Sequence, residues 1–579
     1  MILQALVKYY QDMAAKGEIA EYGWGPEKIS YALCIDEEGN LLQAVSVKEE
    51  SERGKKIAFV PQIMEVPAAV KRSSGIASNF LWDNAAYILG IDGSGNNERT
   101  KKCFEACRNL HSRLLKDSST PAAKALICFF EKWDPDSAAN HPAFADNYED
   151  ILASSNLVFR FKGQYLHQNE QIRSIWKNYY QGTDEKEKGV CLVTGGIEPV
   201  AVLHPSIKGI YGAQSSGASL VSFNAPSFCS YGREQGFNAS TSEYAAFAYG
   251  AALNHLISEK SHSYRIGDTT VLCWADGGDN GYPGLLGAFM FGLDCPYSEK
   301  ELTTMVGRLL EGTCVDYDEC KLDPEKPFYI LGISPNAARL SVRFFLKNSF
   351  GNVIRNVNEH YERLRIQKAA KDTMENIPLW KLLSETVNQN AQDKSPSPEL
   401  TGEVLRAILT GGRYPATLLN GVVLRIRAEH EVTRGRAAII KAYYLKNTNP
   451  DVPKEVLTVA LNKESTNVPY QLGRLFSVLE GIQSTANPGI NSTIKDKYFN
   501  SASATPAVVF PILINLAQKH LKKIDGGLRV ILEKQLGEIQ DKIGEAYPSR
   551  LNLPQQGSFQ LGYYHQTMAR FESKKKEEE

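Results

Sequence analysis

The chain has 579 residues, and its 65 Lys and Arg nearly cancel its 66 Asp and Glu, which leaves a formal net charge of −1. Hydrophobic residues make up 43% and charged residues 23%, a composition typical of a globular protein with several domains. The near-zero charge excludes a uniformly basic nucleic-acid coat protein. A local basic groove remains compatible with it, because a cancelled sum hides how charge is distributed.

Membrane insertion is not expected. The sequence has no run of about 18 apolar residues, and its mean hydropathy is −0.30. Near the N-terminus, Lys8 and Asp12 interrupt any apolar core of a signal peptide. The ten cysteines are irregularly spaced, with none beyond Cys320. Without an export signal, this pattern predicts reduced thiols and a cytoplasmic location.

Residues 1–195 and 196–387 are predicted to form two regions of mixed strands and helices. Short apolar runs bounded by Gly, Pro, Asp or Asn are typical of strands. They lie at 29–35, 190–194, 200–203, 220–223, 269–274 and 328–333. Ser240 and Glu243 have the spacing of a capping box, and an apolar face follows them, so a helix is predicted there.

A second helix is predicted from Ser334 as N-cap, with Pro335 in the first turn. Arg339, Arg343 and Lys347 then fall at i, i+4 and i+8. On a helix these side chains would form one cationic row able to follow phosphates. The alternative is an ordinary solvated face.

The polar segment 388–400 holds two Pro and two Ser without periodicity, so it is predicted to be a linker. Beyond it, apolar positions recur at a period near 3.6, which predicts an all-α helical bundle over 401–579. These segments are 402–412, 418–432, 467–483, 505–524 and 529–543. The expected fold class is therefore α+β (mixed α/β) followed by a helical bundle. The start of the bundle is locally basic, with Arg425, Arg427, Arg434 and Arg436 close together.

The usual catalytic motifs are absent from the sequence. GxxxxGK[ST] and HExxH do not occur, and the glycines around Ser215 and Ser216 do not fit GxSxG. Cys103, Cys107 and His111 share one helix face, but no fourth ligand or CxxC pair accompanies them, so they are predicted to lie in a core. We expect no catalytic residue, metal or cofactor.

Residues 71–84 combine cations with small polar residues. Lys71 and Arg72 supply charge, and Ser73 begins a short turn whose backbone N–H groups suit phosphate. Asn79 follows, and its carboxamide could pair with adenine. The alternative is a solvated basic turn before an amphipathic helix.

Residues 211–240 are dense in Gly, Ser, Asn and Gln, with aromatic residues interleaved. Such a loop suits close approach to a nucleic-acid backbone or stacking of an unpaired base. The candidate contacts are Gln214, Ser215, Ser216 and Asn224. The alternative is a surface loop whose aromatic residues lie in the core.

Long motifs follow one another in order along the chain. They are MILQALVKYYQ with GWGPEKISYALCIDEEGNL, KRSSGIASNFLWDNAAYILGI, GAQSSGASLVSFNAPSFCSYG, SPNAARLSVRFF and GGRYPATLLNGVVLRIRAE. Together they resemble the large-subunit family of the type I-C CRISPR-associated Cascade complex. The resemblance covers nearly the whole chain.

The resemblance implies a non-enzymatic subunit of a crRNA-guided complex that reads the protospacer-adjacent motif in double-stranded DNA and helps to open the duplex. It implies as partners the crRNA, the backbone subunits, the crRNA-processing subunit, the small subunit and a helicase-nuclease. Under it, Lys71, Arg72, Ser73 and Asn79 are candidates for the motif duplex. Gln214, Ser215, Ser216 and Asn224 are candidates for a wedge or groove loop, and Arg339 and Arg343 for backbone phosphate. The alternatives are a nuclease or guide-processing subunit and a purely structural one.

Overall fold

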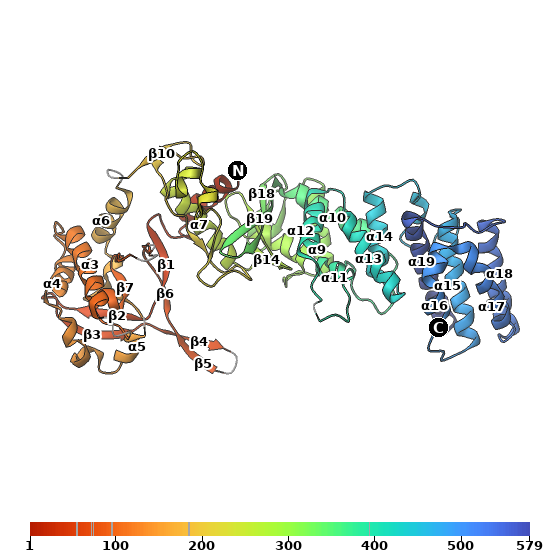
Figure 1. Ribbon diagram of the computed structural model, residues 1–579, viewed down its shortest axis with the longest axis horizontal. Helices are drawn as coiled ribbons and strands as arrows, with labels where there is room; N and C mark the ends of the chain where they lie inside the picture. Colours follow the sequence, from red (N-terminus) through yellow and green to blue (C-terminus); the bar gives the residue numbers. More distant parts are fainter. Residues whose placement is uncertain are drawn as a thin grey trace. The chain divides into compact units, whose positions relative to one another are not determined.

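The computed structural model describes residues 1–53, 56–70, 72, 75–93, 97–153, 155–182, 186–392 and 394–578. Its contacts divide the chain into two compact units, which we describe separately. The first unit comprises 1–205 with 222–253, and the second comprises 206–221 with 254–579. Strands and helices are mixed in the N-terminal part and helices dominate the C-terminal part (Figure 1), which confirms the predicted fold class.

A five-stranded sheet forms the centre of the first unit. Its path is β3 (Leu41–Ser46), β2 (Tyr31–Ile35), β8 (Asn156–Phe161) and β7 (Trp82–Asn84), with β9 (Gln164–Tyr165) paired to β8. Strands β2 and β8 are parallel, so the chain must cross over between them. Helices α3 (Asn97–Leu115) and α4 (Pro121–Lys132) lie in this crossover, and their apolar faces share one core with the sheet.

Two antiparallel ribbons, a small hairpin and several helices complete the first unit. These are β1 (Trp24–Ile29) with β6 (Gln62–Pro67), β4 (Glu49–Arg53) with β5 (Lys56–Val60), β10 (Lys188–Val190) with β11 (Ile197–Pro199), α1 (Ile2–Ala15), α2 (Ala85–Ile88), α5 (Tyr148–Leu152) and α6 (Glu170–Gln181). Helix α7 (Glu243–Ser258) begins in the first unit and ends in the second. The helix predicted near Ser240 is confirmed as α7, but Ser242 caps it by accepting a hydrogen bond from the Ala245 N–H at 3.2 Å.

Cys103, Cys107 and His111 are buried in the core of the first unit, as predicted for α3. The Nε2 atom of His111 accepts a hydrogen bond from the backbone N–H of Leu81 at 2.8 Å. Its Nδ1 atom lies 2.8 Å from the carbonyl oxygen of Cys107, so Nδ1 must carry the proton. The neutral ring thus forms hydrogen bonds with both the Leu81 N–H and the Cys107 carbonyl. Burial lowers the pKa of His111 to about 4.

This geometry predicts acid lability of the first unit. An unfolded histidine titrates near pH 6.5, so between pH 6.5 and about 4 the unfolded chain binds a proton that the folded chain rejects. The contribution of His111 is fully present above pH 6.5, and about 2 kcal/mol of it is lost at pH 5. The measurement is the unfolding free energy at pH 7 and pH 5 for the wild type and His111→Gln. An equal pH dependence in both proteins would contradict the assignment.

A six-stranded sheet begins the second unit. Its order is β12 (Ser206–Ile207), β13 (Ala218–Ser219), β19 (Arg339–Ser349), β18 (Pro327–Asn336), β15 (Thr269–Ala275) and β14 (Ser263–Ile266). Strands β15 and β18 confirm the predictions at 269–274 and 328–333. The predictions at 190–194, 200–203 and 220–223 are wrong for most of their residues, which form turns and loops. In the first two runs buried and exposed apolar residues are mixed, since Leu192, Val202 and Leu203 are exposed, so these runs are not continuous core strands.

The helix predicted from Ser334 is wrong, because residues 327–349 form the β18–β19 hairpin. The chain turns at 337–338, where Ala337 has a φ of 52°. Helix α10 (Phe350–Leu364) starts only after Ser349, whose hydroxyl accepts a hydrogen bond from the Asn352 N–H at 3.4 Å. Arg339, Arg343 and Lys347 therefore lie on a strand.

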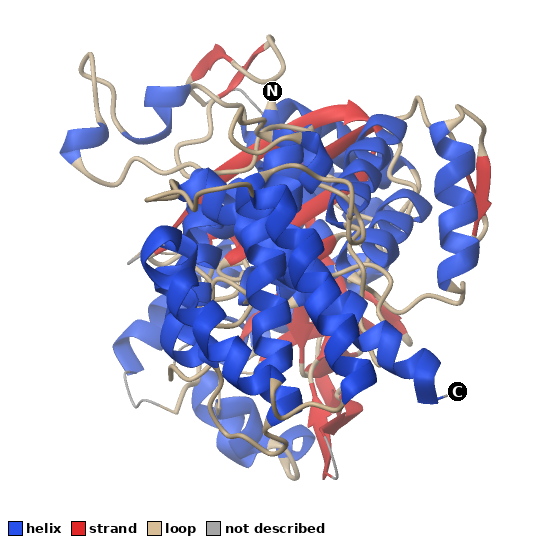
Figure 2. Ribbon diagram, turned by 90° about the vertical axis from the view of Figure 1, so that its right-hand side faces the viewer, coloured by secondary structure: helices blue, strands red, loops and turns tan. Residues whose placement is uncertain are grey.

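Helices make up most of the remaining chain (blue in Figure 2). They are α8 (Gly281–Leu286), α9 (Glu299–Leu310), α11 (Leu379–Ser384), α12 (Pro398–Thr410), α13 (Ala416–Glu429), α14 (Arg434–Lys446), α15 (Val468–Ala486), α16 (Ile494–Ala504), α17 (Pro506–Leu521), α18 (Gly526–Ile543) and α19 (Leu553–Glu578). A small hairpin of β16 (Val315–Tyr317) and β17 (Cys320–Leu322) lies among them in the sequence. Every helical segment predicted beyond residue 401 is confirmed.

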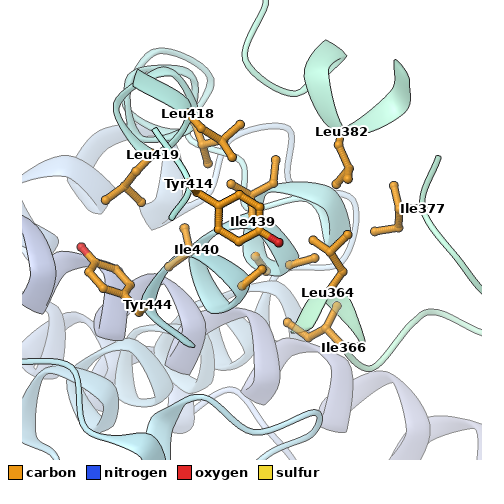
Figure 3. Packing of buried hydrophobic residues seen from close by; sticks show 14 of the residues in the cluster. Leu364, Ile366, Ile377, Leu382, Tyr414, Leu418, Leu419, Ile439, Ile440 and Tyr444 are labelled. Atoms are coloured by element: carbon orange, nitrogen blue, oxygen red, sulfur yellow. The ribbon is translucent and has the colours of Figure 1, made fainter. Parts of the chain in front are cut away.

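One hydrophobic core joins the sheet of the second unit to its helices. Figure 3 shows part of it, where Leu364 of α10, Leu382 of α11 and Ile439 of α14 surround Tyr414. The predicted linker 388–400 lies inside the second unit, and helices on both sides of it belong to the same core. Over the described ranges, no helix is both long and apolar enough to cross a membrane.

Candidate nucleic-acid interface

Several turns of the second unit meet at one end of its sheet. The β14–β15 turn follows Ile266, and the β18–β19 turn lies beside it because Ile333 of β18 pairs with Thr270 of β15. The loop between β12 and β13 reaches the same end, since Ser219 pairs with Arg339. We name the side chains gathered here the sheet-end surface: Tyr211, Gln214, Ser215, Ser216, Arg265, Arg339 and Arg343.

The loop between β12 and β13 is built from two successive turns. The Ala213 N–H donates to the Ile210 carbonyl at 3.2 Å, and the Gly217 N–H donates to the Gln214 carbonyl at 2.9 Å. Gly217 has a φ of 96°, which favours glycine. Apolar residues anchor the loop, because Ile207, Ile210 and Ala218 are buried. The turns between them expose Tyr211, Gln214, Ser215 and Ser216.

Arg265 of β14 joins this loop to the sheet. Its guanidinium carbon lies 3.1 Å from the centroid of the Tyr211 ring, and its Nε donates to the Gly267 carbonyl at 3.1 Å. Arg265 and Tyr211 are both exposed. A cation over an aromatic ring is attracted by the negative face of the ring, so this contact orients both side chains.

Arg343 is the extra residue of a β-bulge in β19, where the register shifts between Gly332 and Ile333 of β18. It is exposed and forms an ion pair with Asp268 at 3.2 Å. An ion pair at a protein surface contributes only about 0–1 kcal/mol. A phosphate group can therefore replace Asp268 as the partner of Arg343 at little cost.

The first predicted cluster is anchored by a carboxylate in the first unit. Asp83 is buried and accepts two hydrogen bonds from the Arg72 guanidinium, one of them at 3.0 Å. It also accepts one from the Asn79 N–H at 2.9 Å. The Arg72 guanidinium lies over the Tyr87 ring, 3.9 Å from its centroid. Arg72 thus fixes the base of a loop. Its charge is paired with Asp83, and one face of its guanidinium is covered by the Tyr87 ring.

Asn79 belongs to the same anchored base. The residue is only 4% exposed, and its Oδ1 accepts a hydrogen bond from the Val70 N–H at 2.8 Å. The carboxamide therefore ties together the two ends of the loop between β6 and β7 and is not presented at the surface. Lys71 and Ser73, the other candidates of this cluster, lie outside the described residues.

The second predicted cluster is divided between the two units. Gln214, Ser215 and Ser216 belong to the second unit, where they join Arg339 and Arg343 at the sheet-end surface. Asn224 is exposed and belongs to the first unit. The aromatic residues of this loop are not all in a core, since Tyr231 is fully exposed.

The arginines that crowd the start of the helical region have internal partners. Arg434 forms an ion pair with Asp372 at 2.9 Å. Arg436 is only 2% exposed and forms ion pairs with Glu385, at 3.3 Å, and with Glu429. These two side chains connect α14 to neighbouring segments, so their positive charge is matched by acidic side chains.

Three residues of these sites were not predicted from the sequence: Arg265, Asp83 and, as an individual contact, Tyr211. Arg265 lies between buried Tyr264 and Ile266, an alternation that marks it as outward-facing on a strand. Its contact with Tyr211 has no local signal, because the two residues lie far apart in sequence. Asp83 follows the apolar run 80–82, and no feature of that position indicates a buried anchor.

The comparisons with known proteins agree with the motif pattern over the chain. A family model described as CRISPR-associated protein (Cas_Csd1) matches residues 6–571. No curated protein matches the chain. Because the family model spans nearly the entire sequence, the chain belongs to the Csd1 family of CRISPR-associated proteins.

Proposed function

We propose that this chain is the non-catalytic large subunit of a type I-C Cascade complex and recognises the protospacer-adjacent motif in double-stranded DNA. Its role would extend to opening the duplex and recruiting the helicase-nuclease in antiviral defence. The observation that supports this best is the sheet-end surface, where exposed Arg265 and Arg343 stand beside exposed Gln214 and Tyr211. Membership of a CRISPR-associated family makes nucleic acid the expected ligand of such a surface.

The charge distribution suits this role. Guide pairing carries most of the sequence information in a crRNA-guided complex, so a protein subunit has to read only a few base pairs. A net charge of −1 limits indiscriminate binding to DNA, while a few local arginines supply phosphate contacts. The proposed partners are the crRNA, the backbone subunits, the crRNA-processing subunit, the small subunit and the helicase-nuclease, in the cytoplasm.

In the first unit, we propose that the loop between β6 and β7 approaches the motif duplex. Asp83, Arg72 and Asn79 would fix its base, and Lys71 and Ser73 would supply its contacts. Asn79 would affect DNA binding by holding the loop in place, because its carboxamide already has a backbone partner.

Asn79→Ala is accordingly expected to weaken binding of the assembled complex to correct and altered motif DNA by the same factor. Loss of one buried hydrogen bond costs about 1 kcal/mol, so the loop is loosened and its contacts weaken together, roughly fivefold on either DNA. The measurement compares dissociation constants on matched duplexes that differ only in the motif. A loss confined to the correct motif would show direct base reading by Asn79.

The rival functions make separable predictions. A nuclease or guide-processing subunit would cut labelled DNA or RNA when the purified chain is incubated with and without magnesium, and we expect intact substrates. A purely structural subunit would keep its target affinity when Lys71 and Gln214 are replaced, provided that assembly persists. We expect that affinity to fall.

A further inference from the structure

We propose that Tyr211 is a stacking platform for an unpaired base and that the adjacent turn contacts the edge of that base. This inference rests on the proposed function, because it assumes that nucleic acid lies on the sheet-end surface. It adds to the proposed function a class of ligand, namely a nucleotide that is not paired in the duplex.

The Tyr211 ring has one covered face and one open face. A guanidinium carbon 3.1 Å from the ring centroid can only lie above the ring plane, because the ring's own atoms occupy that distance within the plane. The residue is nevertheless 58% exposed. Most of this exposure must therefore belong to the opposite face and the edge of the ring, which is where a base would stack.

The exposed ring is also held in place. Arg265 covers one face and is itself fixed by its hydrogen bond to the Gly267 carbonyl. The backbone of Tyr211 lies in the turn closed by Ala213 and Ile210, and a Cβ at Gly212 would lie 3.3 Å from the Pro335 side chain. A ring fixed before binding loses little conformational entropy when a base stacks on it.

Groups that recognise a base follow Tyr211 in the same loop. Gln214 offers a donor and an acceptor, and Ser215 and Ser216 offer hydroxyl groups, all of them exposed. Arg343 and Arg265 are within the same surface and suit the flanking phosphates. Bases inside a duplex have no free face, so an aromatic platform of this kind selects an unpaired base.

The experiment uses the assembled complex bound to target DNA that carries 2-aminopurine at successive positions of the displaced strand. The fluorescence of this base analogue falls when it stacks. We expect one position to be quenched in the wild type and in Tyr211→Phe, which keeps the ring, and unquenched in Tyr211→Ala. We also expect Tyr211→Ala to weaken binding of single-stranded DNA roughly tenfold.

The control is Tyr231→Ala, which removes a fully exposed tyrosine of the first unit and should leave the quenching unchanged. The inference is overturned if no position is quenched, if Tyr211→Ala retains the quenching, or if Tyr211→Ala prevents assembly while Tyr211→Phe permits it. The last result would identify a protein contact. Failure of the proposed function has a separate readout, because Arg343→Ala would then leave duplex affinity unchanged.

Discussion

Replacing Arg265 and Arg343 together with alanine is expected to weaken binding of the assembled complex to target DNA by roughly a hundredfold. A hydrogen bond to a charged group contributes about 1.5 kcal/mol, and two such contacts give about 3 kcal/mol, which corresponds to that factor. Folding should be unaffected, because both side chains are exposed and the ion pair between Arg343 and Asp268 lies at the surface. The measurement is the dissociation constant on target duplex at fixed salt.

The matched control removes the same charge elsewhere in the second unit. Arg308 and Arg365 are exposed; Arg308 donates a hydrogen bond to the Cys314 carbonyl, and Arg365 forms an ion pair with Glu362. Replacing both with alanine should change affinity little. The salt dependence separates the two pairs further, because each lost phosphate contact lowers the slope of log affinity against log salt by about one unit. Equal losses for both pairs would point to a general charge effect.

Gly473→Ala is expected to destabilise the second unit by more than about 3 kcal/mol, at or above the upper end of the usual cost of overpacking. Helices α15 and α19 approach so closely that a Cβ at Gly473 would overlap the carbonyl oxygen of Phe559. A Cβ at Gly562 of α19 would likewise overlap the carbonyl oxygen of Tyr470. Backbone atoms cannot rotate away as a side chain can, so the helices must separate.

Gly537→Ala provides the control for this prediction. Gly537 is exposed within α18, and among the described residues no atom beyond its own stretch of helix backbone lies within 4 Å of the Cβ that alanine would add. Alanine forms helices better than glycine, so this variant should stabilise the protein by about 0.5–1 kcal/mol. The measurement is the denaturation midpoint of the second unit in each variant. If Gly473→Ala were tolerated as well as Gly537→Ala, the close packing of α15 on α19 would be contradicted.

The periodicity of the sequence predicted the helices after residue 401 and the central strands, but it failed at the β18–β19 hairpin. Leu340 and Phe344 are buried four residues apart, a spacing that fits both a helix and a strand. The bulge at Arg343 interrupts the alternation that would have indicated a strand. Ser334 and Pro335 resemble a helix start, whereas in the structure they end β18 before its turn.

The candidate site was predictable only where its residues are close in sequence. Gln214, Ser215 and Ser216 stand out as a polar turn, and their exposure agrees with that interpretation. The pairing of Arg265 with Tyr211 depends on how β14 and the β12–β13 loop are placed by the sheet, which no local pattern encodes. Charge patterns also gave a wrong indication in one place, since Arg434 and Arg436 are paired with acidic side chains of neighbouring segments.

The most direct test of the sheet-end surface is ultraviolet cross-linking of the assembled complex on target DNA, followed by mass spectrometry of the linked peptides. An aromatic ring stacked on a base cross-links efficiently, so we predict linked nucleotides on the peptide that contains Tyr211 and residues 214–216. Linked nucleotides found only outside 206–221 and 263–349 would contradict the account.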